Sequence, residues 1–193
     1  MNQELYKKVE QFVIDSFNKT YSFNEVNKIS QIKHFIRTVH WVKELRPDAD
    51  EALLISAVAH DIERAFRQKD VLEKKKSAKF SDLDWLRIHE ERGAEIVSDF
   101  LKQQGAADEI IERVAMLVSR HEEGGNDDQN ILKDADSLSF FENNIPLFLT
   151  EVVGKVGKER VREKFDWMYN RITSEKAKQI ALPWYKEAIA KLN

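Results

Sequence analysis

The sequence predicts an all-α protein folded as a single domain, and three observations lead to this prediction. The chain has only 6 glycines and 3 prolines among its 193 residues, so residues that break helices are rare. Apolar residues recur every three to four positions along most of the chain, which is the spacing of one helix face. No segment shows convincingly the alternation of apolar and polar residues that indicates a strand.

The first half of the chain is expected to contain three helices. Residues 3–17 carry an apolar stripe, and residues 24–45 carry a second one that ends before the first proline, because the residue before a proline disfavours helical conformation. A third helix is expected over about 50–66, and Asp48 or Asp50 can cap its N-terminus.

The second half continues the helical pattern after one polar interruption. Residues 67–81 carry charges of both signs without a clear period, so we expect a loop or a frayed helix there. Ser81 or Asp82 is expected to begin the next helix, which Gly105 ends. The helices expected after the interruption cover about 82–104, 107–121 and 129–142, with two or three more within 145–192.

Composition excludes several classes of protein. A net charge of −3 gives no basic excess for binding a nucleic acid polymer, and the absence of cysteine excludes disulfides and thiolate metal sites. No apolar run approaches the roughly 20 residues of a membrane span, and the acidic, amphipathic N-terminus is unlike a targeting signal. We therefore expect a cytoplasmic enzyme or binding domain that does not associate with a membrane. The sequence leaves open whether the protein forms a homodimer.

The most informative stretch is Leu53 to Phe66, which reads LLISAVAHDIERAF. Its apolar run indicates a buried helix, and the run ends at the pair His60–Asp61. A buried imidazole and carboxylate need polar partners, and a metal ion is one such partner. Candidate ligands lie on four other expected helices: His34, His89, His121 and either Asp134 or Asp136.

This ligand set and its neighbours indicate chemistry on phosphate. Nitrogen and oxygen ligands without thiolates suit Mn, Fe, Co, Ni, Zn or Mg, and such an ion makes hydroxide available near neutral pH. Arg37, Arg64 and Arg92 each follow a candidate ligand by about one helical turn. We expect these three arginines to line a pocket that holds a phosphate group.

Three short motifs together resemble the HD-domain metal-dependent phosphohydrolase superfamily. They are His34 followed by Arg37-Thr38-Val39, then His60-Asp61-Ile62, then Ala135-Asp136-Ser137-Leu138. The resemblance covers about residues 30–142. It implies an all-α bundle of the HD-domain type, with residues 145–193 packing on this core. It also implies that one metal is bound by His34, His60, Asp61 and Asp136, which favours Asp136 over Asp134.

Some members of that superfamily hold two metals, which the Asp of the doublet bridges. His89 and His121 fall where the extra ligands occur, although substrate contact or support of a ligand stays open for both. The chain lacks the Gly-Tyr-Pro signature of the cyclic-dinucleotide phosphodiesterases and the Glu-Asp pair of the guanosine-tetraphosphate hydrolases. Arg64 stands where many members have Lys, which implies a cationic contact with substrate.

The resemblance implies a metal-dependent phosphohydrolase that acts on a small phosphorylated metabolite such as a nucleotide. Asp61, Glu63 and Arg64 are the expected catalytic residues, with Glu63 either a general base or an ion-pair partner of Arg64. Two alternatives stay open. One is a di-iron oxygenase on the same fold, and the other is a non-catalytic sensing or structural domain that a metal stabilises.

Overall fold

The computed structural model describes residues 4–20, 24–67, 80 and 82–192, and this part of the chain is helical without a strand. The all-α prediction is confirmed for it. Most of the polar segment 67–81, expected as a loop or frayed helix, lies outside the described residues. Among the described helices, none is both long enough and apolar enough to cross a membrane.

The first half of the chain forms the expected helices with one difference. Asn24 and Asp50 accept hydrogen bonds from the first turns of the second and third helices, as N-caps do. The third helix ends before His60, because Asp61 (φ −102°, ψ 15°) leaves the helical region. The chain continues as a separate 3₁₀ turn, so the prediction of one helix to residue 66 is wrong. The elements are α1 (Glu4–Lys19), α2 (Glu25–Leu45), α3 (Glu51–Ala59) and the 3₁₀ helix η1 (Ile62–Phe66).

The second half follows the predicted pattern closely. Asp82 caps the helix that begins at Leu83, while the next helix ends at Val118, before His121. A short π-helical segment, a form frequent at functional sites, connects α8 to α9. The elements are α5 (Leu83–Gln103), α6 (Asp108–Val118), α7 (Asp127–Asn143), α8 (Ile145–Leu147), η2 (Phe148–Val152), α9 (Val153–Val156), α10 (Lys158–Asn170) and α11 (Glu175–Leu192).

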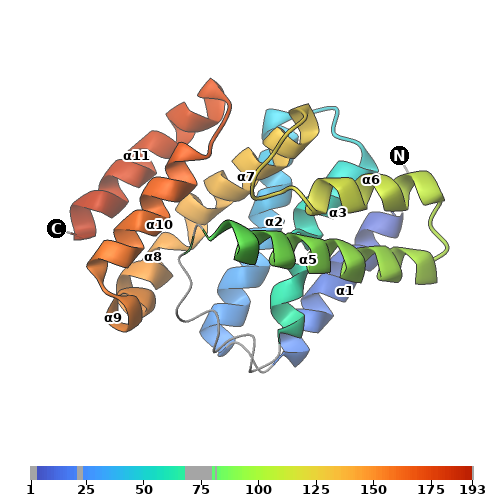
Figure 1. Ribbon diagram of the computed structural model, residues 1–193, viewed down its shortest axis with the longest axis horizontal. Helices are drawn as coiled ribbons and strands as arrows, with labels where there is room; N and C mark the ends of the chain where they lie inside the picture. Colours follow the sequence, from blue (N-terminus) through green and yellow to red (C-terminus); the bar gives the residue numbers. More distant parts are fainter. Residues whose placement is uncertain (1–3, 21–23, 68–79, 81, 193) are drawn as a thin grey trace.

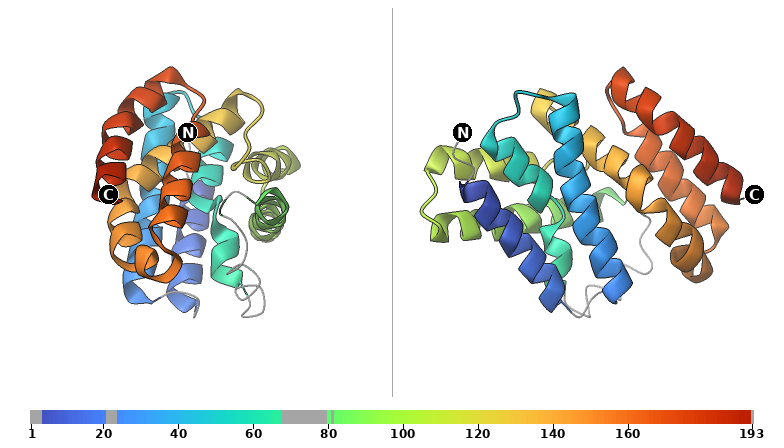
Figure 2. Two further views of the ribbon diagram at one scale, coloured as in Figure 1. Left: turned by 60° about the vertical axis from the view of Figure 1, so that its left-hand side comes forward. Right: turned by 180° about the vertical axis from the view of Figure 1, so that it is seen from behind.

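The helices are arranged around the pair α2 and α7, which pack along each other in the middle of the molecule (Figure 1). The antiparallel pair α5 and α6 lies at one end, and α10 with α11 lies at the opposite end (Figure 2). Helices α1 and α3 fill the space between α2 and the α5–α6 pair. Elements from both ends can therefore meet at the central pair.

Two clusters of buried apolar side chains hold this arrangement together. The first is built by α1, α2, α3, α5 and α6, and it reaches Leu132 and Ala135 of α7. The second begins at Leu138 on the same helix and continues through α10 and α11. Asp136 lies on α7 between the residues of the two clusters. The border between the clusters is thus where polar side chains can gather inside the molecule.

Candidate metal centre

Four histidines from different parts of the chain converge at this border. Neighbouring ring centroids lie 5.3 Å apart for His34 and His60, 5.2 Å for His60 and His121, and 5.4 Å for His121 and His89. All four side chains are buried. The structure therefore brings together the four histidines that the sequence pattern selects.

Local structure explains how these histidines reach the border. Helix α3 is buried along nearly its whole length, and its end delivers His60 into the interior. Gly93 lies one turn after His89 on α5, and a Cβ there would be in ordinary van der Waals contact with the carbonyl oxygen of His60 (3.4 Å). Helix α5 therefore packs directly against the chain at His60, which brings His89 into the group.

Two of the histidines have one nitrogen fixed and the other unpartnered. The Nδ1–H of His60 donates to the carbonyl oxygen of Ala57 (2.9 Å), and that of His121 donates to Val118 (2.8 Å). A carbonyl oxygen only accepts, so Nδ1 carries the proton, and Nε2 has a free lone pair when the ring is neutral. Burial opposes protonation of His60, but the charges of Asp61 and Asp136 raise its pKa above the usual value, and a bound metal ion would compete with that proton. Both Nε2 atoms are buried without a hydrogen-bond partner among the described residues. Such atoms are suited to ligate a metal ion.

The other two histidines are oriented in the same way by different partners. The hydroxyl of Ser139 donates its proton to the carbonyl oxygen of His34 (2.7 Å), so it accepts from His34 Nδ1 (2.9 Å). His89 Nδ1 donates to Glu63 Oε2 (2.7 Å). Each ring therefore also presents Nε2 to the group, in the arrangement typical of metal-ligating histidines.

The carboxylate of Asp61 connects two sets of potential ligand atoms. One set comprises His34, His60 and Asp61, and the other comprises Asp61, His89, His121 and Glu122, with the ligand atoms of each set within 4.8 Å of one another. Asp136 Oδ1 joins the first set, at 3.0 Å from His34 Nε2 and 3.5 Å from His60 Nε2. Asp61 is thus placed as a bridge between two possible metal positions.

Asp134, the alternative to Asp136, has a different task. Its carboxylate accepts hydrogen bonds from the backbone N–H groups of Thr173 (2.7 Å) and Ser174 (2.8 Å), which lie just before α11. Residues two apart on a helix point in different directions, and here only Asp136 faces the histidines.

Charge and burial tune the groups of the centre. Burial lowers the pKa of His121 to about 4 and also lowers that of His34, which keeps both rings neutral near pH 7. Burial opposes ionisation of Asp61 and Asp136, but Arg64 beside the first and Arg171 beside the second hold the pKa of each well below its usual range. Neutral imidazoles and ionised carboxylates are the forms that ligate metals.

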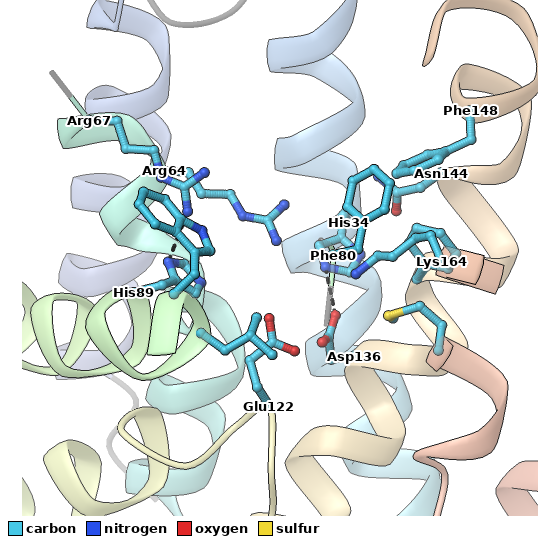
Figure 3. Close-up of a pocket in the computed structure, with 14 residues that line it drawn as sticks. His34, Arg64, Arg67, Phe80, His89, Glu122, Asp136, Asn144, Phe148 and Lys164 are labelled. Carbon is cyan, nitrogen blue, oxygen red and sulfur yellow. Dashed lines mark hydrogen bonds and ion pairs between the residues drawn. The ribbon is translucent and has the colours of Figure 1, made fainter. Parts of the chain in front are cut away.

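A cavity of about 150 Å³ opens beside the histidines. Arg64 reaches toward it from one side and Lys164 from the other, above Asp136 and Glu122 (Figure 3). Lys164 lies 4.3 Å from the ring centroid of Trp167, and no carboxylate lies within ion-pair distance of it among the described residues. The lining residues are His34, Arg64, Arg67, Phe80, Trp85, Leu86, His89, Glu122, Asp136, Phe140, Asn144, Phe148, Lys164 and Met168.

Two of the three arginines expected to line the pocket, and the expected catalytic residue Glu63, are absent from this lining. Arg37 lies instead in an ion pair with Glu142 (2.7 Å), and Arg92 is not among the lining residues. The prediction that Arg37 and Arg92 line the pocket is wrong for this cavity, since spacing along a helix does not fix which face turns inward. Glu63 is buried behind His89, where it pairs with Arg67 (2.6 Å) rather than with Arg64.

Sequence reasoning missed Glu122, Lys164 and Arg171. Glu122 directly follows His121, and an acidic residue beside a candidate ligand was a usable signal. Lys164 and Arg171 lie on or directly after α10, far along the chain from the motifs, and nothing in their local sequence distinguishes them from surface cations. Arg171 makes ion pairs with both Glu122 and Asp136.

These donors fit one or two divalent ions. Four imidazole nitrogens face three carboxylates, and a metal ion at the border would satisfy the two buried, unpartnered Nε2 atoms. No curated protein and no solved structure matches the chain. A family match does exist, and it extends well beyond the histidine cluster to include α10 and most of α11. The chain belongs to the family described as "Domain of unknown function (DUF4202)", which it matches over residues 13–191.

Proposed function

We propose that this protein is a metal-dependent phosphohydrolase of the HD-domain type that acts on a small phosphorylated metabolite. The observation that carries the proposal is the pair of unpartnered Nε2 atoms, on His60 and His121, on either side of Asp61. A ligand set of this kind beside a cavity with cationic walls suits an anionic substrate better than a neutral one.

Two ions would be held by the two sets of ligands. His34, His60 and Asp136 would hold one, His89 and His121 with Glu122 would hold the other, and Asp61 would bridge them. When bound, such ions polarise a phosphoryl oxygen and lower the pKa of a water molecule, which generates a nucleophile near neutral pH.

The cationic side chains of the cavity would bind and orient the phosphate. Arg64 already donates to Asp61 Oδ2 (2.9 Å), and its buried Nε–H has no partner among the described residues, so it has a donor to offer. Lys164 would face the phosphate from the opposite wall as a point charge. Charge that develops on the phosphoryl oxygens would be stabilised from both sides.

The third wall of the cavity is aromatic and would contact the organic part of a small substrate. Phe80, Phe140 and Phe148 pack on one another, with ring centroids 6.2 Å apart for Phe80 and Phe148 and 5.2 Å for Phe140 and Phe148. These rings line the cavity together with Trp85 and Met168. A compact, partly apolar leaving group would exclude water by contact with this wall.

The test combines metal analysis with a substrate screen. The purified protein is loaded with Mn, Fe, Co, Ni, Zn or Mg and assayed on p-nitrophenyl phosphate, phosphodiesters and nucleotides. We expect hydrolysis that chelation abolishes and that His60→Ala lowers by about 100-fold or more. The matched control is His40→Ala, because His40 lies outside the cluster and packs against Trp41.

Three other outcomes would decide against the proposal. Hydrolysis that survives both chelation and His60→Ala would refute the metal mechanism. Bound metal that raises the melting temperature without any turnover would favour a sensing or structural domain. Iron content with oxygen consumption and no phosphatase activity would favour the di-iron oxygenase.

A further inference from the structure

Arg171 is the residue that connects the two ligand sets from outside the cluster. It follows α10, its side chain is buried, and its guanidinium lies 4.6 Å from the centroid of the Trp167 ring. Nε donates to Ser137 Oγ (2.9 Å), and the two terminal nitrogens donate to Glu122 Oε2 and Asp136 Oδ2. All three nitrogens of the guanidinium are thus used.

The two carboxylates divide their oxygens in the same way. Asp136 turns Oδ1 toward His34 Nε2 (3.0 Å) and gives Oδ2 to Arg171. Glu122 turns Oε1 toward His121 Nε2 (3.8 Å) and gives Oε2 to Arg171. One planar guanidinium therefore binds one carboxylate of each ligand set. In both carboxylates it binds the outer oxygen, which is the one not turned toward a histidine.

We propose that Arg171 is a positioning residue that fixes Asp136 and Glu122 as ligands through one oxygen each, one in each half of the metal centre. This inference rests on the metal centre of the proposed function. A carboxylate can bind a metal through one oxygen or two, and a guanidinium on the outer oxygen removes the second choice. Coordination positions that a second oxygen would fill then stay open for substrate and water.

The proposal makes the end of α10 part of the centre. A rigid guanidinium spans two carboxylates in a way that an ammonium on a flexible stem does not. Replacement by Lys keeps the positive charge, so it separates the effect of charge from the effect of geometry. Ser137 and Trp167 hold the guanidinium in place from its remaining edge and from its face.

The experiment measures metal binding rather than turnover. Arg171→Ala and Arg171→Lys are titrated with Co(II), and the number of bound ions, their affinity and the visible absorption are compared with those of the unaltered protein. We expect affinity to fall by about 10- to 100-fold in Arg171→Ala. Absorption per ion should fall as well, because a carboxylate that binds through two oxygens raises the coordination number. Added guanidinium ion should restore part of the affinity of Arg171→Ala.

The matched control is Arg113→Ala. Arg113 also bridges two carboxylates, donating to Asp50 (2.8 Å) and Asp128 (2.6 Å), but it does so on the surface away from the histidines. Its loss should leave the cobalt titration unchanged. If Arg171→Ala does not fold, as judged by circular dichroism in chelator, Arg171→Lys is read alone, with weaker binding and altered absorption expected.

Wild-type affinity, stoichiometry and absorption in the folded Arg171 variants would overturn the inference. Failure of the proposed function is a separate result. A wild-type protein that binds two ions but hydrolyses no phosphoester would refute that function, while an effect of Arg171 on cobalt binding would still support the positioning role.

Discussion

The contact between Glu63 and His89 allows a sharp test of the proposed metal half-site that contains His89 and His121. Glu63 Oε2 accepts from His89 Nδ1 (2.7 Å) and from Arg67 Nε (2.6 Å). These two partners, working against burial, lower the pKa of Glu63, so the side chain is ionised near neutral pH. The substitution Glu63→Gln keeps the size of the side chain and removes its charge.

The size of the effect follows from the strength of the lost contact. A hydrogen bond to a charged group contributes about 1.5–3 kcal/mol, and 1.4 kcal/mol corresponds to about tenfold in affinity. We therefore expect metal affinity at this half-site to fall by about 10- to 100-fold. The half-site with His34 should bind as before, because Ser139 rather than Glu63 orients that ring.

The assay is a Co(II) or Mn(II) titration followed by calorimetry, with metal content measured after dialysis. Glu142→Gln is the matched control, since Glu142 likewise accepts from a guanidinium, that of Arg37 (2.7 Å), and from a ring N–H, that of Trp41 (2.9 Å). The expected result is one tight and one weakened site in Glu63→Gln and two tight sites in the control. Two sites of wild-type affinity in Glu63→Gln would refute the orienting role of Glu63.

Three further predictions concern stability. Metal at 1,000 times its dissociation constant should stabilise the protein by about 4 kcal/mol, seen as a higher melting temperature that chelator or His60→Ala removes; an unchanged melting temperature would contradict the metal centre. Asp134→Ala should cost about 1–3 kcal/mol because the start of α11 loses its acceptor, yet metal content should stay constant; loss of metal would make Asp134 the ligand. Burial raises the pKa of Glu90 to about 8, so the folded state binds the extra proton and stability falls as pH rises from about 4.5 to 8. Glu90→Gln should therefore increase the free energy of unfolding more at pH 8 than at pH 5, by about 1.5 kcal/mol if screening leaves a third of the shift. Thermal and denaturant unfolding at the two pH values measure this difference, and equal gains at both would contradict it.

Much of the fold can be predicted from the sequence because its helices have local causes. The apolar period and the caps Asn24, Asp50 and Asp82 lie within each helix, so most helix bounds come within a few residues of those expected. The apolar run before His60 also indicates that this helix lies in the interior, as it does. The interruption at Asp61 is different, because tertiary contacts of the His60–Asp61 pair outweigh the helical period there.

The site could be predicted only where a residue has a recognisable neighbour. His34, His60 and Asp136 occur in short motifs, and the structure brings them together. Arg37 has the same spacing from a ligand as Arg64, but Glu142 holds it on another face. Lys164 and Arg171 reach the histidine cluster because α10 packs against the rest of the molecule. No local sequence pattern predicts that packing.

The sharing of α7 between the two apolar clusters has a practical consequence for the smallest unit that can be expressed. A chain cut after residue 142 would retain every motif of the HD-type pattern. It would also leave Leu138, Phe140 and Phe141 without the partners that α10 and α11 provide, and apolar patches of this kind favour aggregation. Any shortened version that is meant to stay folded should therefore keep α11 to its last turn.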